Sequence, residues 1–390
     1  MRFAIMETVV TPGGHEIDFD RLLVEELTSL GHTVEFYVPE GHEFKWNYGV
    51  PVHRLPGKGI SYQGAKGIKK LLLSFQRERN RQKWYKGMYV NACQHNFDAI
   101  IVPSATYRYL RGLKRSPLQH SPVPVLFLIH GATPEEALKL NQMAIYFKHE
   151  KNIRIGVQTF APKKLRLTSP NIKVYGPPNY IPRDIDAEAE RKKYDMDVLR
   201  LGFFGQYRKE KKIEAFLAAF LSCKFTRPVK LICQGATQTQ EDADDFARII
   251  EKYKGHDNIE FWNKPLIGDE WQRGLASVDT LVLPYGNDRY LYHTAALISN
   301  AMGYKKSIIA AHNVNPEILA HYFMGMGFLN GNMQALKQCI ELFVNTYDEN
   351  REKYEQALAK AYDDFSPRRL AENIVALAEG DFGKPKKRGQ

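Results

Sequence analysis

Short apolar runs alternate with amphipathic segments along most of the chain. In the first half, the runs that predict strands cover residues 2–7, 32–39, 97–104, 124–131, 153–159 and 172–179. Between the first two runs, residues 19–31 carry apolar side chains at near-helical spacing, which predicts a helix that ends at Gly31. Continuous apolar runs suit parallel strands that helices cover on both faces, so the first half predicts an α/β unit with a parallel sheet.

The same pattern starts again after a polar segment at residues 183–197. The strands predicted in the second half cover residues 199–206, 228–235, 258–265, 279–285 and 306–312, with helical patterns between them. We therefore predict two doubly wound α/β domains at 1–182 and 198–365, joined by a linker at 183–197. Residues 366–390 are expected to form a C-terminal helix, which could return to the first domain, and a basic tail.

Composition agrees with two folded domains. The chain has 390 residues, of which 44% are hydrophobic and 25% charged, which excludes wholesale disorder. Its four cysteines are scattered with no CxxC pair, so neither a zinc site nor a disulfide framework is predicted, and a reducing compartment fits best. The N-terminus lacks the features of a signal peptide and no run approaches the roughly 18 apolar residues of a membrane span, so we expect a cytoplasmic protein.

Most of the net charge of +11 lies in one segment. Residues 58–86 contain nine basic side chains and a single acidic one, Glu78, and apolar residues recur there at helical spacing from Ile68 to Phe75. This pattern is typical of a basic amphipathic helix, and the alternative is a solvated helix that aids solubility. Scattered aromatics form no stacking platform, so nucleic acid is not expected. The candidates for contact with an anionic membrane or an acceptor are Lys66, Lys69, Lys70, Arg77, Arg79 and Arg81.

Ligands of open parallel sheets lie beyond the carboxyl ends of the strands, so the residues that follow each apolar run are the first candidates. Five motifs also follow one another in order along the chain. They are Thr11-Pro12-Gly13-Gly14-His15, Leu30-Gly31-His32-Thr33-Val34, Phe204-Gly205 followed by Lys211, Pro284-Tyr285 after Asp279, and Asn300-Ala301-Met302 with residues 307–310. In this order they resemble the GT-B glycosyltransferases, and among them the retaining family four enzymes. The resemblance implies two Rossmann-like domains facing a central cleft, with the acceptor in the first and a nucleotide sugar in the second.

The chain departs from the family pattern at several motif positions. The usual arginine of the Phe204-Gly205 element is Gln206, although Arg208 could supply the charge. The two glutamates of the family fall on Tyr292 and Asn300, and Lys305 and Ser307 replace a glycine and a proline. The identity of the donor therefore cannot be transferred.

Strand-end residues supply the candidate chemistry of the second domain. Arg208 and Lys211 sit at a strand-to-helix turn, where two cations would neutralise a diphosphate leaving group, and each is equally well explained as a solvated surface cation. The turn at Thr294, Ala295 and Ala296 opens a helix whose amides could bind the same phosphates. Further donor contacts are expected from Gly205, Gln234, Lys264, Pro265 and Asn300, the last of which could instead be an ordinary partly buried side chain.

In the first domain, Gly13 and Gly14 permit close approach of the backbone to a phosphate or a sugar hydroxyl, and His15 follows them; a plain strand-to-helix turn is the alternative. His130 follows five apolar residues and resembles the family histidine that contacts the transferred sugar, unless it only caps a strand. Together with Arg208 and Lys211 it is the predicted catalytic group. Should the enzyme invert, a base would be required, and His15, Asp18 and Glu7 are the candidates.

These residues predict a glycosyltransferase that moves a hexosyl residue from a nucleotide-diphosphate sugar to a glycan or lipid-linked acceptor at the cytoplasmic membrane face, with retention of configuration. The resemblance implies that the leaving phosphate serves as the base for the acceptor hydroxyl, and no metal or cofactor is expected. The alternatives are a nucleotide-sugar 2-epimerase of the same fold and a non-catalytic two-domain binding protein. A nicotinamide dehydrogenase is disfavoured, since TPGGHE lacks the third glycine of its fingerprint.

Overall fold

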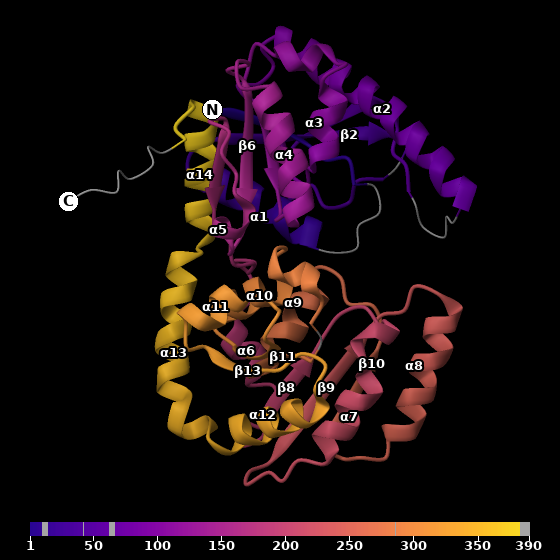
Figure 1. Cartoon of the computed structure of the whole chain (residues 1–390), viewed down its shortest axis with the longest axis vertical. Coiled ribbons are helices and arrows are strands. Elements are labelled where there is room, and N and C mark those ends of the chain that lie inside the picture. Colours follow the sequence, from indigo (N-terminus) through magenta and orange to yellow (C-terminus); the bar gives the residue numbers. More distant parts are fainter. Residues whose placement is uncertain (10–14, 42, 62–66, 285, 383–390) are drawn as a thin grey trace, which may run out of the picture. The chain divides into compact units, whose positions relative to one another are not determined.

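The computed structural model describes residues 1–9, 15–41, 43–61, 67–284, 286–382 of the chain. Their contacts divide into two compact units (Figure 1). The first unit comprises Met1–Pro177 together with the chain from Pro367 onward, and the second comprises Pro178–Ser366. Among the described residues, no helix combines the length and apolarity that crossing a membrane requires.

The first unit is built on a seven-stranded parallel sheet. Its strands are β1 (Arg2–Met6), β2 (Thr33–Glu40), β3 (Val52–Lys58), β4 (Ala99–Val102), β5 (Val125–Ile129), β6 (Ile153–Gln158) and β7 (Ile172–Tyr175). Its helices are α1 (His15–Ser29), α2 (Gly67–Cys93), α3 (Tyr107–Leu113), the 3₁₀ turn η1 (Pro117–His120), α4 (Pro134–Tyr146), α5 (Pro162–Leu165) and α14 (Pro367–Glu379). All five residues of β5 are buried, as expected for a central strand with both faces covered.

The second unit repeats this plan on six parallel strands. They are β8 (Leu199–Phe203), β9 (Val229–Gly235), β10 (Ile259–Asn263), β11 (Thr280–Leu283), β12 (Ser307–Ala311) and β13 (Gly325–Phe328). The helices are α6 (Ala187–Arg191), η2 (Lys209–Lys211), α7 (Ile213–Leu221), α8 (Gln240–Tyr253), α9 (Asp269–Ala276), η3 (Asp288–Leu291), α10 (Ala296–Tyr304), α11 (Pro316–His321), α12 (Met333–Asn345) and α13 (Tyr347–Asp364). The segment 183–197 contains α6 and belongs to this unit.

Strand order places one crevice in each unit. The first sheet runs β3-β2-β1-β4-β5-β6-β7 and the second β10-β9-β8-β11-β12-β13. The direction of winding therefore reverses between β1 and β4 in the first sheet and between β8 and β11 in the second. In parallel sheets, ligands bind outside the carboxyl ends of the strands at such a reversal, so these two positions are where a site is expected.

The last helix completes the first unit rather than the second. In α14, Leu370, Ile374 and Leu377 are buried, and the helix contacts α1, β5 and β6. Arg154 on β6 donates from Nη1 to the carbonyls of Leu377 (2.8 Å) and Ala378, so a cation satisfies the C-terminal carbonyls of this helix.

One predicted element has different bounds in the structure. The basic helix predicted from Lys58 to Lys86 begins at Gly67 and continues to Cys93, while Lys58 ends strand β3. The pattern of β3, VHRLPGK, carries few apolar residues because only Leu55 of this edge strand is fully buried, so the periodicity gave no signal for it.

Candidate functional site

The loop after β8 forms one side of the crevice in the second unit. Gly205 has a φ of +119°, a conformation that side chains with a Cβ atom rarely adopt, so glycine is required there. A Cβ atom on this residue would lie 3.3 Å from Nζ of Lys211. The glycine thus permits the lysine ammonium to approach the backbone at the end of β8.

Gln234 fixes the position of this loop from the neighbouring strand. It is 1% exposed near the end of β9, and its Oε1 accepts from the Gly205 N–H at 2.8 Å. Its Nε2 donates to the Lys264 carbonyl at 2.7 Å. One buried side-chain amide on β9 therefore connects the loops that follow β8 and β10. Gln234 was predicted to contact the donor, but both polar atoms of its side chain bond backbone groups of the protein.

Arg208 and Lys211 lie on the 3₁₀ turn η2 and its N-cap, but in different environments. Arg208 is exposed and donates from Nη2 to Gln206 Oε1 at 3.1 Å. Lys211 is half-buried, with Nζ 5.4 Å from the centre of the Phe203 ring. Burial, aided by the positive charge of Arg208, lowers the pKa of Lys211 to about 8. The ammonium is thus poorly hydrated at neutral pH, and an anion that reaches it gains more than it would at a surface lysine.

The turn before α10 forms the other side of the crevice. Ala295 is the N-cap of this helix, and its N–H donates to Asn315 Oδ1 at 2.8 Å. Asn315 also donates to the carbonyls of Tyr290 and His293, so this residue, which sequence reasoning missed, holds the turn in place. The N–H of Ala295 therefore bonds within the protein and is not available to a ligand. The remaining candidate donors at this turn are the N–H of Ala296 and the hydroxyl of Thr294. The Thr294 hydroxyl is buried and has no partner among the described residues.

Asn300 is buried inside the second unit. It is 2% exposed, and its Nδ2 donates to the Tyr180 carbonyl at 3.0 Å. This environment agrees with the alternative that Asn300 is an ordinary buried side chain. Its amide anchors the start of the second unit against α10.

Lys264 and Pro265 are exposed on the loop after β10. The ammonium of Lys264 pairs with Glu270 at 3.3 Å. A cavity of about 560 Å³ borders this loop and extends along β10 and α9, where Trp262 and Arg273 contribute to its wall.

In the first unit, His130 directly follows β5, half-buried at the carboxyl edge of the sheet. Its Nε2 lies 2.7 Å from the Pro103 carbonyl, which can only accept, so Nε2 carries a proton. The ring packs edge-on against Phe19 at 4.5 Å between centroids. Gly13, Gly14 and the side chain of His15 lie outside the described residues.

Two buried carboxylates lie near this edge. Glu7 follows β1 and is 3% exposed, and Asp20 on α1 is 4% exposed. The Val9 N–H donates to one oxygen of Glu7, whereas Glu7 Oε2 and Asp20 Oδ1 are buried with no partner among the described residues. Burial raises the pKa of Glu7 to about 7, and burial with the nearby charge of Glu7 raises that of Asp20 well above its usual range. Glu7 was among the bases predicted for an inverting reaction, whereas Asp20 was not predicted, because no sequence pattern links two carboxylates so far apart in the chain.

The N-terminal half of α2 presents an unpartnered apolar stripe. Ile68, Leu71, Leu72 and Phe75 are 81%, 74%, 65% and 73% exposed, whereas Trp84 in the second half is fully buried. Figure 1 shows the helix reaching past the neighbouring helices of its unit. The stripe and the exposed basic side chains of Lys69, Lys70 and Arg79 together form an exposed amphipathic surface, which we call the α2 surface.

The predicted basic residues of α2 fall into two groups. Lys69, Lys70 and Arg79 are exposed. Arg77 instead donates to the Tyr109 hydroxyl at 3.2 Å, and Arg81 is 2% exposed, pairs with Glu78 at 2.6 Å and stacks on the Tyr109 ring. Arg81 thus cannot contact a membrane or an acceptor, because packing against α3 encloses it. Lys66 lies outside the described residues.

The part of the chain that the structure describes holds no group of three or more His, Cys, Asp or Glu side chains placed to bind a metal. The groups at the second crevice are the cations of Arg208 and Lys211, the N–H of Ala296 and the hydroxyl of Thr294, with one carboxylate, Glu210, 3.8 Å from Arg208. Such a set fits a phosphate-bearing ligand.

No family model matches the sequence, and no curated protein matches it. Solved structures do match over nearly the whole chain. HepE from Anabaena in complex with UDP and glucose is 14% identical with a TM-score of 0.63, covering 97% of this chain and 99% of that one. A glycosyltransferase from Rickettsia africae is 12% identical with a TM-score of 0.68, covering 98% and 99%.

WaaG, a glycosyltransferase involved in lipopolysaccharide biosynthesis, is 13% identical with a TM-score of 0.61, covering 97% of this chain and 100% of that one. Identities this low speak to the fold alone. The two parallel sheets with their interleaved helices therefore confirm the predicted fold: the chain has the GT-B fold of these glycosyltransferases.

Proposed function

We propose that this protein is a glycosyltransferase that uses a nucleotide-diphosphate sugar as donor. The observation that carries the proposal is the cationic turn at the crevice of the second unit. There the required glycine at 205 admits the half-buried ammonium of Lys211, and Arg208 stands beside it. The GT-B fold supports the proposal, and HepE, which shares it, binds UDP and glucose.

In this proposal, Lys211 and Arg208 stabilise the charge that develops on the diphosphate when the bond to the sugar breaks. An ammonium already withdrawn from water needs little reorganisation to meet that charge. The amide of Ala296 and the hydroxyl of Thr294 supply further donors at the same crevice. His130 is proposed to contact the transferred sugar from the carboxyl edge of β5, where its Nε2 donates to the Pro103 carbonyl.

Retention of configuration remains part of the proposal, with the leaving phosphate as the base for the acceptor hydroxyl and no metal. For an inverting reaction, we propose Glu7 as the general base among the predicted carboxylates, because its pKa of about 7 suits proton transfer at neutral pH.

We further propose a glycan or lipid-linked acceptor at the cytoplasmic face of an anionic membrane. The exposed apolar stripe of α2 next to Lys69, Lys70 and Arg79 supports this, because apolar side chains enter the headgroup region while lysines meet anionic lipids. WaaG, a protein of this fold, takes part in lipopolysaccharide biosynthesis.

Donor binding tests the proposal. A thermal-shift panel of UDP-, ADP- and GDP-sugars should give a selective increase in melting temperature, since a ligand at 100 times its Kd adds about 2.7 kcal/mol of stability. Titration calorimetry with the best donor should then show affinity reduced about tenfold or more in Lys211→Met, because a charge-assisted contact to phosphate is lost.

The matched control is Lys209→Met. Lys209 lies on the same turn, is exposed and pairs with Glu241 at 2.8 Å, so its loss should leave the affinity nearly unchanged. If no nucleotide sugar shifts the melting temperature at millimolar concentration, the proposed activity is wrong. If Lys211→Met binds as tightly as the wild type, the phosphate site lies elsewhere.

A further inference from the structure

A second cavity lies at the opposite edge of the second sheet from the proposed donor site. It measures about 550 Å³ and is bordered by Leu199 and Ser307, the first residues of β8 and β12, and by residues of α6 and α13. The donor crevice is at the carboxyl ends of the same strands, so the two sites are separated by the length of the sheet. The α10 helix begins at the donor turn and ends at Tyr304, which lines this cavity.

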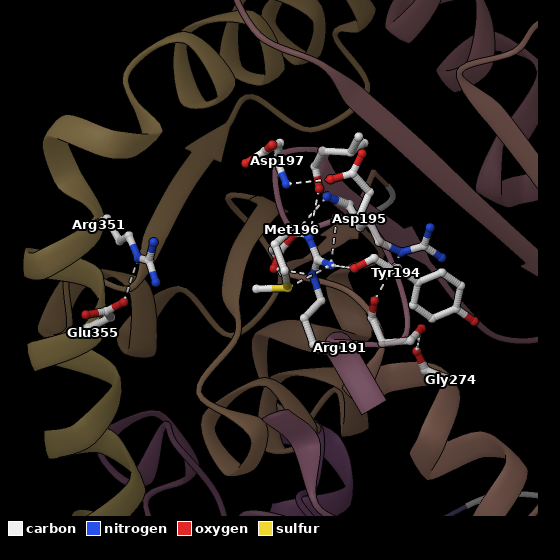
Figure 2. Close-up of polar contacts among 12 residues, drawn as sticks. Arg191, Tyr194, Asp195, Met196, Asp197, Gly274, Arg351 and Glu355 are labelled. Atoms are coloured by element: carbon white, nitrogen blue, oxygen red, sulfur yellow. Dashed lines mark hydrogen bonds and ion pairs between the residues drawn. The ribbon is translucent and has the colours of Figure 1, made fainter. Parts of the chain in front are cut away.

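The carboxylates around the cavity already have cationic partners. The pairs are Asp279 with Arg191 (2.7 Å), Asp348 with Arg227 (2.7 Å), Glu355 with Arg351 (2.8 Å) and Glu188 with Lys192 (2.5 Å). Figure 2 shows Arg191 with hydrogen bonds to the carbonyls of Tyr194 and Asp195 and to the sulfur of Met196, and Arg351 bound to Glu355 on α13. With these acids neutralised, Lys305 and Lys306 leave the cavity wall with an excess of positive charge.

Lys306 is the exceptional member of this wall. It is 9% exposed, and among the described residues its ammonium makes neither a hydrogen bond nor an ion pair. Asp279, whose charge acts on this ammonium, already accepts from Nε and Nη2 of Arg191 and from the Arg200 N–H. Burial lowers the pKa of Lys306 to about 8. Burying an unpaired ammonium is costly, which indicates a ligand in place of an internal partner.

Two other residues that line the cavity each carry a buried polar atom with no partner among the described residues. The hydroxyl of Tyr354 is buried without a hydrogen bond, on a residue that is 1% exposed. Nε of Arg227 is likewise buried and unsatisfied. Because buried polar groups are nearly always hydrogen-bonded, three unsatisfied donors around one cavity are unusual. All three can donate to an anion.

We propose that this cavity is a binding site for a small organic phosphate, with Lys306 as its ion-pair partner and Tyr354 as a hydrogen-bond donor. A phosphate offers several acceptor oxygens to donors that come from different elements. The volume exceeds that of the phosphate alone, and the rings of Tyr304 and Tyr347 in the wall suit a compact polar body such as a sugar.

Titration calorimetry on the full chain tests this with inorganic phosphate and glucose 6-phosphate, neither of which carries a nucleotide. Saturable binding to the wild type is expected. Lys306→Met should weaken it about tenfold or more, and Tyr354→Phe about fivefold. The matched control is Lys353→Met, which removes an exposed lysine of α13 that does not line the cavity and should bind as the wild type. The double variant Arg208→Ala/Lys211→Met should also retain binding.

Binding that survives in Lys306→Met, or that disappears in the Arg208→Ala/Lys211→Met variant, would overturn the proposal; the second result would place phosphate at the donor crevice. Absence of saturable phosphate binding to the wild type would also overturn the proposal. Thermal melting tests whether Lys306→Met folds. If this variant does not fold, phosphate binding by Tyr354→Phe tests the proposal, since that substitution keeps the ring and removes only the hydroxyl. Donor affinity is measured separately, so failure here leaves the proposed transferase activity untouched.

Discussion

Glu7 shows how burial sets the chemistry of a single residue. Its pKa of about 7 lies above the ordinary 4.5, so between these values the folded state holds a proton that the unfolded state has released. Its contribution to stability is therefore present below about pH 4.5 and is lost as the pH rises through about 7. Glu7→Gln stays uncharged, and we expect it to stabilise the protein by about 1–3 kcal/mol at pH 8 and far less at pH 5.

Urea denaturation of both proteins at the two pH values measures this difference. Glu349→Gln is the control, because it removes an exposed carboxylate of α13 and its effect should not change with pH. A stabilisation by Glu7→Gln that is equal at pH 5 and pH 8 would show that Glu7 is ionised throughout.

At the scale of the element, α2 combines two functions in one continuous helix. Its second half packs Trp84 and Met88 into the core, while its first half exposes Leu71 and Phe75. We expect Leu71→Gln/Phe75→Gln to reduce binding to phosphatidylglycerol vesicles at least about tenfold, since each buried side chain contributes about 1.5–3 kcal/mol. The melting temperature and donor affinity should stay unchanged, because both residues are exposed.

Vesicle co-sedimentation measures the binding, and Leu138→Gln is the control. Leu138 on α4 is 61% exposed in the same unit but lies outside the α2 surface. Equal loss in Leu138→Gln would indicate general apolar adhesion, and unchanged binding of the double variant would remove the membrane from the proposal.

At the scale of the whole molecule, the path of the chain decides which unit each helix stabilises. Ile374 on α14 and Ile340 on α12 are both fully buried and lie only 34 positions apart, yet they belong to the first and second units. Ile374→Ala should destabilise the first unit by about 2–5 kcal/mol, and Ile340→Ala the second by a similar amount. In calorimetric scans, the two variants should lower different transitions; a shift of the same transition by both would contradict this division.

The buried strands of this protein could be predicted from the sequence, whereas its edge strands and the environments of its site residues could not. The strands β1, β5 and β8 were predicted from the sequence, because strands buried on both faces consist mostly of apolar residues. The edge strands β3 and β13 each have a single buried residue, so they need few apolar residues and were not predicted.

The sequence alone determined the parallel α/β plan, its restart in the second half and the loops at which chemistry would lie, because these depend on periodicity and on chain order, which are local properties. Only the tertiary structure decided the state of each side chain. It buried Arg81 against Tyr109 and committed Gln234 and Asn300 to backbone groups. It also buried Lys306 with no ion-pair partner among the residues that the structure describes. The physical reason is that desolvation and hydrogen bonding depend on neighbours that are distant in the sequence, and the pattern of apolar residues carries no record of those neighbours.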